Sequence, residues 1–225
     1  MLIETVAREV YRQLEELGEA KTAVRQGCVF MTNMNPNIRM EAVLNLCAAA
    51  KRQKKYGVCL PQWFVAKGKE ALEGTDLKTA TVVGLPGGRT STLAKYAEIK
   101  QAVREGAEAV FVPVNMEYCR SGAVQEARKD LVQCLTAAKG KAKTAAILEV
   151  KDLSVGRIEE VAEACVDGGA DVVMLSSVTG GNVRLDTVRK LKERGIRVGV
   201  YGGTSQPGRQ EEFRQAGAHW MTALY

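Results

Sequence analysis

Residues 78–115 read KTATVVGLPGGRTSTLAKYAEIKQAVREGAEAVFVPVN and contain two short apolar runs separated by an amphipathic segment. The runs, KTATVVGL (78–85) and AEAVFVPVN (107–115), are rich in Val, Leu and Thr. Continuous apolar character over so few residues is typical of strands that are covered on both faces of a parallel sheet. The segment between them, TLAKYAEIKQAVREG (92–106), has the length of a helix. The stretch therefore predicts a strand–helix–strand unit.

The same alternation extends over the rest of the chain. Further apolar runs lie at 27–32, 56–60, 144–150, 170–177, 196–203 and 218–224. Amphipathic stretches such as 40–55 and 154–169 lie between them. Eight alternations in 225 residues predict an α/β protein with a (β/α)8 TIM barrel, in a single domain that spans residues 1–225. A doubly wound open sheet is the alternative.

Local signals mark the ends of two helices. Ser154 precedes a helical pattern and can cap it, and Gly168-Gly169 can end the same helix. Ser91 or Thr92 can cap the helix that follows the apolar run ending at residue 85.

Composition and charge favour a cytoplasmic protein that binds a small anion. The chain is 46% hydrophobic and 26% charged, with a net charge of +6 spread over many segments and only 5% aromatic residues. Nucleic-acid binders more often cluster their basic residues, so we expect no nucleic-acid partner. Charges interrupt residues 1–20 throughout, which excludes a signal peptide or a membrane span there.

The cysteines favour reducing conditions. They are widely spaced and form no C-x-x-C pair: Cys28, Cys47, Cys59, Cys119, Cys134 and Cys165. In a chain of this length, reduced and mostly buried thiols are the simplest interpretation. The chain has one histidine, His219, so we expect no zinc site, no other metal and no cofactor.

Two glycine pairs predict an anion site. In a TIM barrel the functional site lies in the loops after the carboxyl ends of the strands. Gly180-Gly181 and Gly202-Gly203 follow the sixth and seventh predicted strands. Their backbone N–H groups could approach a phosphate or carboxylate. The alternative is that these glycines only permit tight turns.

Other polar residues follow the third, fourth and fifth strands. Glu149 and Lys151 share the same parity, and a lysine desolvated at the barrel mouth could act as a nucleophile. Equally, the two could form an ion pair, or Lys151 could lie outside the strand. Asn115 is expected to face a ligand. Arg120 could cap a helix or form an ion pair at the surface, and Arg89 could reach into the mouth of the barrel or remain in solvent.

Residues 58–115 resemble the corresponding part of deoxyribose-phosphate aldolases. The resemblance rests on Val-Val-Gly-Leu-Pro-Gly-Gly (82–88) and on the helix after it, which has the pattern Lys-x-x-Glu-x-Lys-x-Ala. The similarity resumes at Arg120-Ser121-Gly122, Ile147-Leu148-Glu149, Gly169-Ala170-Asp171 and Gly202-Gly203. The resemblance implies a class I aldolase, in which a lysine forms a Schiff base with acetaldehyde and glyceraldehyde 3-phosphate is the acceptor.

The charged centre that the resemblance implies is absent from this sequence. The Schiff-base lysine would follow Gly-Ala-Asp-x-Val, where this chain has Met174. The second lysine falls at Gly199, and the aspartate of the fourth strand falls at Val110, or at Phe111 with a shift of one residue. The aspartate of the first strand falls near Phe30. The resemblance leaves Thr32 in place as a site residue beyond that position.

Three functions follow from these observations. The first is a deoxyribose-phosphate aldolase-like barrel that lacks the Schiff-base chemistry and binds a phosphorylated or anionic metabolite, or acts as a subunit or scaffold. We also expect the chain to form a homo-oligomer. The second is a lyase in which a relocated lysine such as Lys151 forms the Schiff base, since all strand ends of a barrel converge on one pocket. The third is ordinary deoxyribose-phosphate aldolase activity. No lysine lies between Asp152 and Leu185, which argues against the third.

Overall fold

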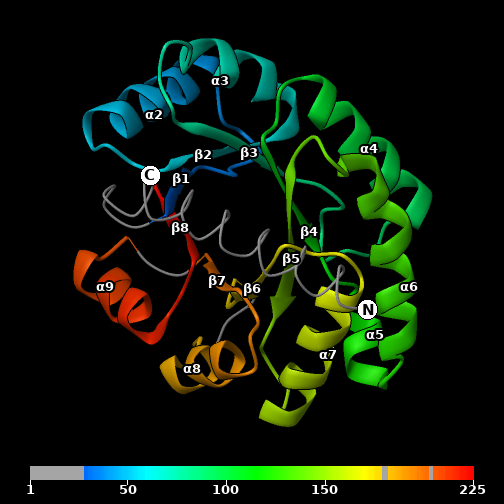
Figure 1. Cartoon of the computed structure of the whole chain (residues 1–225). Helices are drawn as coiled ribbons and strands as arrows, with labels where there is room; N and C mark the ends of the chain where they lie inside the picture. Colours follow the sequence, from blue (N-terminus) through cyan, green and yellow to red (C-terminus); the bar gives the residue numbers. More distant parts are fainter. Residues whose placement is uncertain (1–27, 179–181, 203–204) are drawn as a thin grey trace, which may run out of the picture.

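The computed structural model describes residues 28–178, 182–202 and 205–225. Its strands form one closed parallel barrel in the order β1-β2-β3-β4-β5-β6-β7-β8, so the predicted (β/α)8 barrel is confirmed. Figure 1 shows the helices arranged around this barrel. The strands are β1 (Val29–Thr32), β2 (Gly57–Leu60), β3 (Lys78–Val82), β4 (Ala109–Pro113), β5 (Lys143–Glu149), β6 (Val172–Ser176), β7 (Val198–Tyr201) and β8 (Trp220–Leu224).

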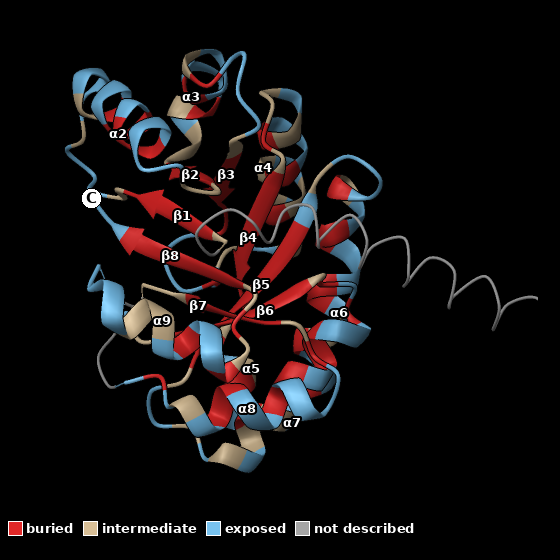
Figure 2. Cartoon of the chain, turned by 60° about the vertical axis from the view of Figure 1, so that its left-hand side comes forward, coloured by how far each residue is buried: buried red, intermediate tan, exposed pale blue. Residues whose placement is uncertain are grey.

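The helices follow the strands in turn. They are α2 (Met40–Arg52), α3 (Val65–Ala71), α4 (Thr92–Arg104), α5 (Met116–Ser121), α6 (Val124–Leu135), α7 (Val155–Asp167), α8 (Leu185–Glu193) and α9 (Pro207–Ala216). Short 3₁₀ turns lie at η1 (Gln62–Phe64) and η2 (Thr136–Ala138). Figure 2 shows strands that are buried along their length and helices whose outer faces are exposed. Among the described residues, no helix is both long and apolar enough to cross a membrane.

Alternate residues of each strand face either the helices or the barrel interior. Val110, Val112, Val173 and Leu175 belong to a core cluster that includes residues of the surrounding helices. A separate cluster fills the interior. Its buried members are Phe30, Cys59, Ala80, Val82, Ala109, Phe111, Ala145, Ile147, Val172, Met174 and Trp220.

This division decides which of two residues takes the position of the implied aspartate of the fourth strand. Counting from Glu108 points to Val110, but Val110 packs toward the helices. Phe111, one residue on, lies in the interior and is fully buried. Counting from Glu108 without the strand's parity placed the residue on the wrong face of the sheet.

The predicted helix ends are confirmed. The Ser91 side chain caps α4 by accepting a hydrogen bond from the backbone N–H of Ala94, and Ser154 caps α7 in the same way through Arg157. Helix α7 ends at Asp167, and Gly169 then adopts a φ of 93°, a left-handed conformation that glycine tolerates best.

A buried ion pair joins α4 to α6. Lys95 Nζ lies 2.6 Å from Asp130 Oδ2, and the two side chains are 1% and 8% exposed. Thr92 Oγ1 donates a second hydrogen bond to Asp130 at 2.7 Å. On the same helix, Glu98 accepts a hydrogen bond from the backbone N–H of Gly84 at 2.7 Å. The helix pattern that carries the family resemblance therefore fixes the connection between β3 and α4.

Candidate functional site

Five polar residues form an arc at the carboxyl end of the barrel, above the apolar interior. Each lies two residues beyond an interior position or glycine, so strand alternation turns it toward the mouth of the barrel. They are Glu149, Ser176, Tyr201, Thr222 and Thr32, from β5, β6, β7, β8 and β1 in that order, and are called the polar arc below. Adjacent strands of a TIM barrel present functional groups at this end.

Hydrogen bonds order the polar arc. Ser176 Oγ donates to Glu149 Oε2 at 3.0 Å, and both residues are buried. Thr32 Oγ1 donates to the backbone carbonyl of Cys59 at 2.9 Å. Thr222 Oγ1 accepts a hydrogen bond from the backbone N–H of Gly202 at 2.7 Å. These bonds tie β6 to β5, β1 to β2, and β8 to the loop that follows β7.

Tyr201 is the aromatic member of the polar arc. Its ring meets Phe111 edge to face, with 6.4 Å between the centroids. Burial raises the pKa of its phenol well above the ordinary value, and the nearby Cys59 thiol adds to the shift. The phenol is therefore a neutral hydrogen-bonding group at physiological pH.

Met174 fills the centre of the barrel below the polar arc. It is 0% exposed and belongs to the interior cluster. It pairs in register with Ile147 on one side and with Gly199 on the other. The position at which the resemblance implies a Schiff-base lysine is therefore an interior position, and an apolar thioether occupies it.

Gly199 is enclosed by its neighbours. A Cβ atom added to it would lie 2.7 Å from the carbonyl oxygen of Trp220 and 3.0 Å from Cγ of Met174. The first of these contacts is with backbone, which cannot swing away as a side chain can. The barrel therefore has no room for a lysine at residue 199 in this packing.

Aromatic rings occupy the remaining space in the interior. Phe30 meets Tyr56, Phe111 and Trp220 edge to face, with centroid distances of 5.0, 5.3 and 5.4 Å. Phe30 and Phe111 lie at or next to the positions where the resemblance implies aspartates. Aromatic packing of this kind stabilises an interior that holds no charge.

The structure does not bring Lys151 into the barrel. Lys151 lies in the turn beyond the end of β5 and is exposed, whereas Glu149 is buried in the mouth. Glu149 and Lys151 share parity in the sequence, but their side chains do not share a direction, because β5 ends at Glu149 and the backbone then turns. Among the described residues the only buried lysine is Lys95, which lies outside the barrel in its ion pair with Asp130.

The remaining predicted site residues have mixed placements. Asn115 caps α5, where its side-chain oxygen accepts a hydrogen bond from the backbone N–H of Glu117 at 3.0 Å. Gly202 has a φ of 65° and is held by Thr222. The other predicted glycines lie outside the described residues: Gly180, Gly181 and Gly203.

The charged candidates near the fourth strand lie in solvent. Arg89 and Arg120 are exposed. Arg120 Nη2 lies 3.9 Å from Asp152 Oδ2. Of the alternatives left open by the sequence, the described structure favours a surface ion pair for Arg120.

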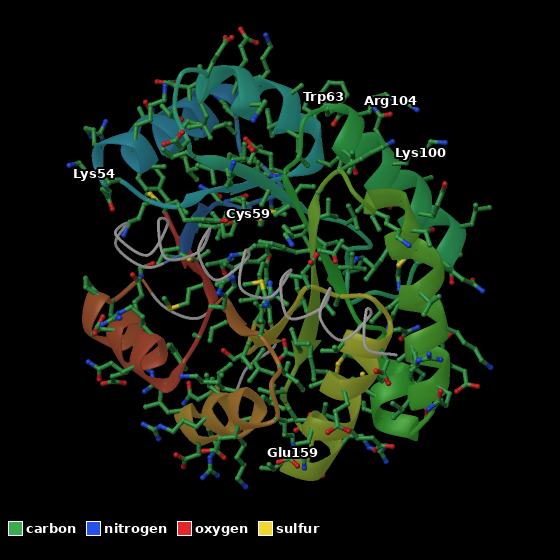
Figure 3. All side chains as sticks on the ribbon, in the orientation of Figure 1. Lys54, Cys59, Trp63, Lys100, Arg104 and Glu159 are labelled. Atoms are coloured by element: carbon green, nitrogen blue, oxygen red, sulfur yellow. The ribbon has the colours of Figure 1, made fainter. Side chains whose placement is uncertain are left out.

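Burial keeps two of the thiols, Cys59 and Cys119, in the protonated form. Cys59 lies inside the barrel (Figure 3), and burial raises its pKa to about 12. Burial likewise raises the pKa of Cys119 to about 11. A thiol that remains protonated is a poor nucleophile. None of the six cysteines, which all lie within the described ranges, is in a disulfide, and only Cys28 is not buried, in agreement with the sequence.

Sequence reasoning did not single out Ser176, Tyr201 or Thr222. The signal was available, because each lies two residues after an interior position of its strand. It could not be used without knowing which parity faces inward.

Comparison with known proteins supports the sequence resemblance. A family model described as "DeoC/LacD family aldolase" matches residues 20–216. A curated deoxyribose-phosphate aldolase from Bacillus mycoides (strain KBAB4) is 32% identical over 191 residues, which cover 83% of this chain and 86% of that protein. One from Clostridium novyi (strain NT) is 32% identical over 163 residues, covering 72% and 73% respectively.

Solved structures share the fold. A putative deoxyribose-phosphate aldolase from Coccidioides immitis superposes with a TM-score of 0.81 at 24% identity, covering 88% of this chain and 81% of that one. A deoxyribose phosphate aldolase from Aeropyrum pernix, described as tetrameric, gives a TM-score of 0.78 at 21% identity, covering 87% and 84%.

Proposed function

The chain belongs to the DeoC/LacD family of aldolases, and from this premise we propose that it is a member without Schiff-base chemistry that binds a small anionic or phosphorylated metabolite at the carboxyl end of its barrel. The observation that carries the proposal is Met174. It occupies the interior position at which the family resemblance implies the reactive amine. A thioether cannot form an imine with a carbonyl substrate.

The surroundings of Met174 support the same conclusion. Gly199 has no room for the second amine, and Phe111 and Phe30 stand where the resemblance implies carboxylates. A lysine with no partner in this interior would be strongly disfavoured in its charged form. The four positions form a consistent apolar set, which a single misalignment would not produce.

Three arguments support an anionic ligand. The curated relatives are named for an aldolase of deoxyribose phosphate, a phosphorylated compound. The chain carries a net charge of +6. Gly202, with Gly180, Gly181 and Gly203, follows strands at which barrels often hold phosphate. Asn115 and Thr32 are the polar side chains that we propose to border this ligand.

We also propose that the protein works in the cytoplasm, because reducing conditions keep its six cysteines as thiols. A homo-oligomer is part of the proposal, since a solved structure with this fold is described as tetrameric. Light scattering coupled to size-exclusion chromatography measures the oligomeric state directly.

The decisive experiment is borohydride trapping. The full chain is incubated with acetaldehyde, and separately with acetone, reduced with sodium borohydride, digested and examined by mass spectrometry. The Bacillus mycoides deoxyribose-phosphate aldolase, treated in parallel, serves as the positive control. We expect an adduct on the control enzyme and no substrate-dependent adduct on this chain.

An adduct on Lys151 would overturn the proposal in favour of a lyase with a relocated amine, and the Lys151→Arg variant would then lose the adduct. Binding is tested separately by calorimetric titration with 2-deoxyribose 5-phosphate, with 2-deoxyribose as the control that lacks phosphate. Binding that requires the phosphate supports the anion site, and equal heats for both compounds contradict it.

A further inference from the structure

A pocket lies at the opposite end of the barrel from the polar arc. It has a volume of 790 Å³ and is lined in part by Phe30, Tyr56 and Trp220. Trp220 is the first residue of β8 and Tyr56 precedes β2, so these rings mark the amino ends of the strands. The volume is in the range of pockets that hold small molecules.

The inner wall of this pocket is aromatic. The Phe30 and Tyr56 rings meet at right angles with centroids 5.0 Å apart, and Tyr56 lies 6.3 Å from Trp220 with the rings tilted by 40°. Flat apolar walls of this kind suit a flat ring, because aromatic pairs gain energy from offset and edge-to-face contact.

One polar atom in this wall has no partner within the described structure. The Nε1 atom of Trp220 is buried and makes no hydrogen bond there, and the residue as a whole is only 3% exposed. A buried indole N–H normally finds an acceptor. A ligand ring that carries a nitrogen or carbonyl oxygen would supply one.

Lysines line the outer part of the pocket. Lys78 and Lys143 lie at the first positions of β3 and β5 and make ion pairs with Glu108 and Asp171. Lys139 and Lys141 also line the pocket and are exposed.

Lys139 and Lys141 differ from Lys78 and Lys143 in their ion pairs. No ion pair of Lys139 or Lys141 occurs within residues 28–178, 182–202 and 205–225, so their charges are available to an anion. They flank Gly140 in the connection between η2 and β5.

We propose that this pocket binds a flat heteroaromatic anion. The ring packs against Phe30, Tyr56 and Trp220, an acceptor on the ring takes the Trp220 N–H, and the anionic group lies toward Lys139 and Lys141. The site is separate from the polar arc and does not depend on the function proposed above.

The two tryptophans make the proposal testable by fluorescence. Trp63 is 86% exposed and lies at the periphery of the barrel (Figure 3), whereas Trp220 is in the pocket wall. The full-length Trp63→Phe variant therefore reports on Trp220 alone. It is titrated with AMP, UMP and 1-naphthoate, and with adenosine and inorganic phosphate as probes that carry only the ring or only the anion.

We expect a saturable change in Trp220 emission with AMP or UMP, weaker binding of adenosine and no change with phosphate. Replacing both pocket lysines by glutamine (Lys139→Gln with Lys141→Gln) should weaken binding of the nucleotide about 3- to 10-fold, as expected for two exposed charge contacts. Lys100→Gln with Lys129→Gln removes the same charge from exposed positions outside the pocket and should change the affinity by less than about 2-fold.

The role of the indole N–H is tested in the background that keeps Trp63. Trp220→Phe retains a ring but no donor, and calorimetry should show weaker binding of AMP. The proposal is overturned if neither AMP nor UMP gives a saturable change, even where 1-naphthoate does. It is also overturned if the two pairs of lysine substitutions have equal effects.

Discussion

Met174 and Gly199 face each other across β6 and β7 inside the barrel, and a Cβ atom on Gly199 would lie 3.0 Å from Cγ of Met174. The Met174 side chain and the absence of a side chain at Gly199 are therefore complementary, because the thioether occupies space that a side chain at residue 199 would need. In the family resemblance both positions are lysines. With an apolar residue and a glycine at these positions, the interior is packed and carries no amine at either of them.

Substitution of Gly199 by alanine tests this packing. The added methyl group would come within 2.7 Å of the Trp220 carbonyl oxygen, so we expect Gly199→Ala to lower the free energy of unfolding by about 1–3 kcal/mol. Urea denaturation at 25 °C measures the change. Gly156→Ala in α7 is the control, because no atom lies within 4 Å of the added carbon and alanine favours helix by roughly 0.5–1 kcal/mol. Two variants of equal stability would contradict the packing argument.

Met174→Lys restores the implied amine without its partners. Because the charge would be buried among apolar side chains, we expect a loss of about 3–5 kcal/mol in the free energy of unfolding. Met174→Leu keeps the volume and should cost less than about 1.5 kcal/mol. We expect no turnover of 2-deoxyribose 5-phosphate by the lysine variant, measured by coupled detection of acetaldehyde. Stability of both variants equal to that of the unmodified chain would show that the interior is less apolar than described.

Thr222→Val tests the bond that holds the loop after β7. The variant loses the acceptor for the Gly202 N–H, so we expect about 1 kcal/mol of destabilisation and weaker binding of 2-deoxyribose 5-phosphate. Thr81→Val is a matched control, because Thr81 is also buried and donates to the Leu60 carbonyl at 2.8 Å, away from this loop. Similar losses of affinity in both variants, measured by calorimetry, would indicate a general effect of stability.

The ion pair between Lys95 and Asp130 should dominate the attachment of α4 to α6. Asp130→Ala leaves a buried ammonium without its carboxylate, and we expect a loss of about 3–5 kcal/mol in the free energy of unfolding. The double variant Lys95→Met with Asp130→Leu removes both charges and should be more stable than Asp130→Ala. Thermal denaturation of the two variants in parallel checks the order, and the reverse order would contradict it.

Glu108 should contribute stability that depends on pH. Partial burial alone would raise the pKa of this carboxyl, but hydrogen bonds from Lys69 and Lys78 outweigh it and hold the pKa below its ordinary value. A lowered pKa in the folded state means that the stabilisation is present above about pH 4.3, the ordinary pKa of glutamate, and is lost as the pH falls through the folded value.

The corresponding experiment compares Glu108→Gln with the unmodified chain by urea denaturation at pH 7 and at pH 3. We expect the variant to be less stable at pH 7 and the difference to shrink at pH 3. Glu73→Gln, at an exposed position near the end of α3, should show no such trend. A difference that is independent of pH would exclude the ion pairs with Lys69 and Lys78 as its source.

The helix caps and the order of the strands could be predicted because their causes are local. Ser91 and Ser154 cap helices through residues three positions along the chain, and Gly169 permits a turn that depends only on its own φ. The placement of Lys151 could not be predicted in this way. Its side chain would share the direction of Glu149 only if the strand continued, and β5 ends at Glu149.

The sequence by itself determined the barrel and its family, and it places Met174 and Gly199 where the family resemblance implies lysines, because periodicity and residue identity are properties of the chain alone. Only the tertiary structure decided which parity of each strand faces inward. It places Phe111, and not Val110, in the interior, and it brings Ser176, Tyr201 and Thr222 together in the polar arc. The physical reason is that a strand has two equivalent faces until closure of the barrel assigns one to the helices and the other to the interior.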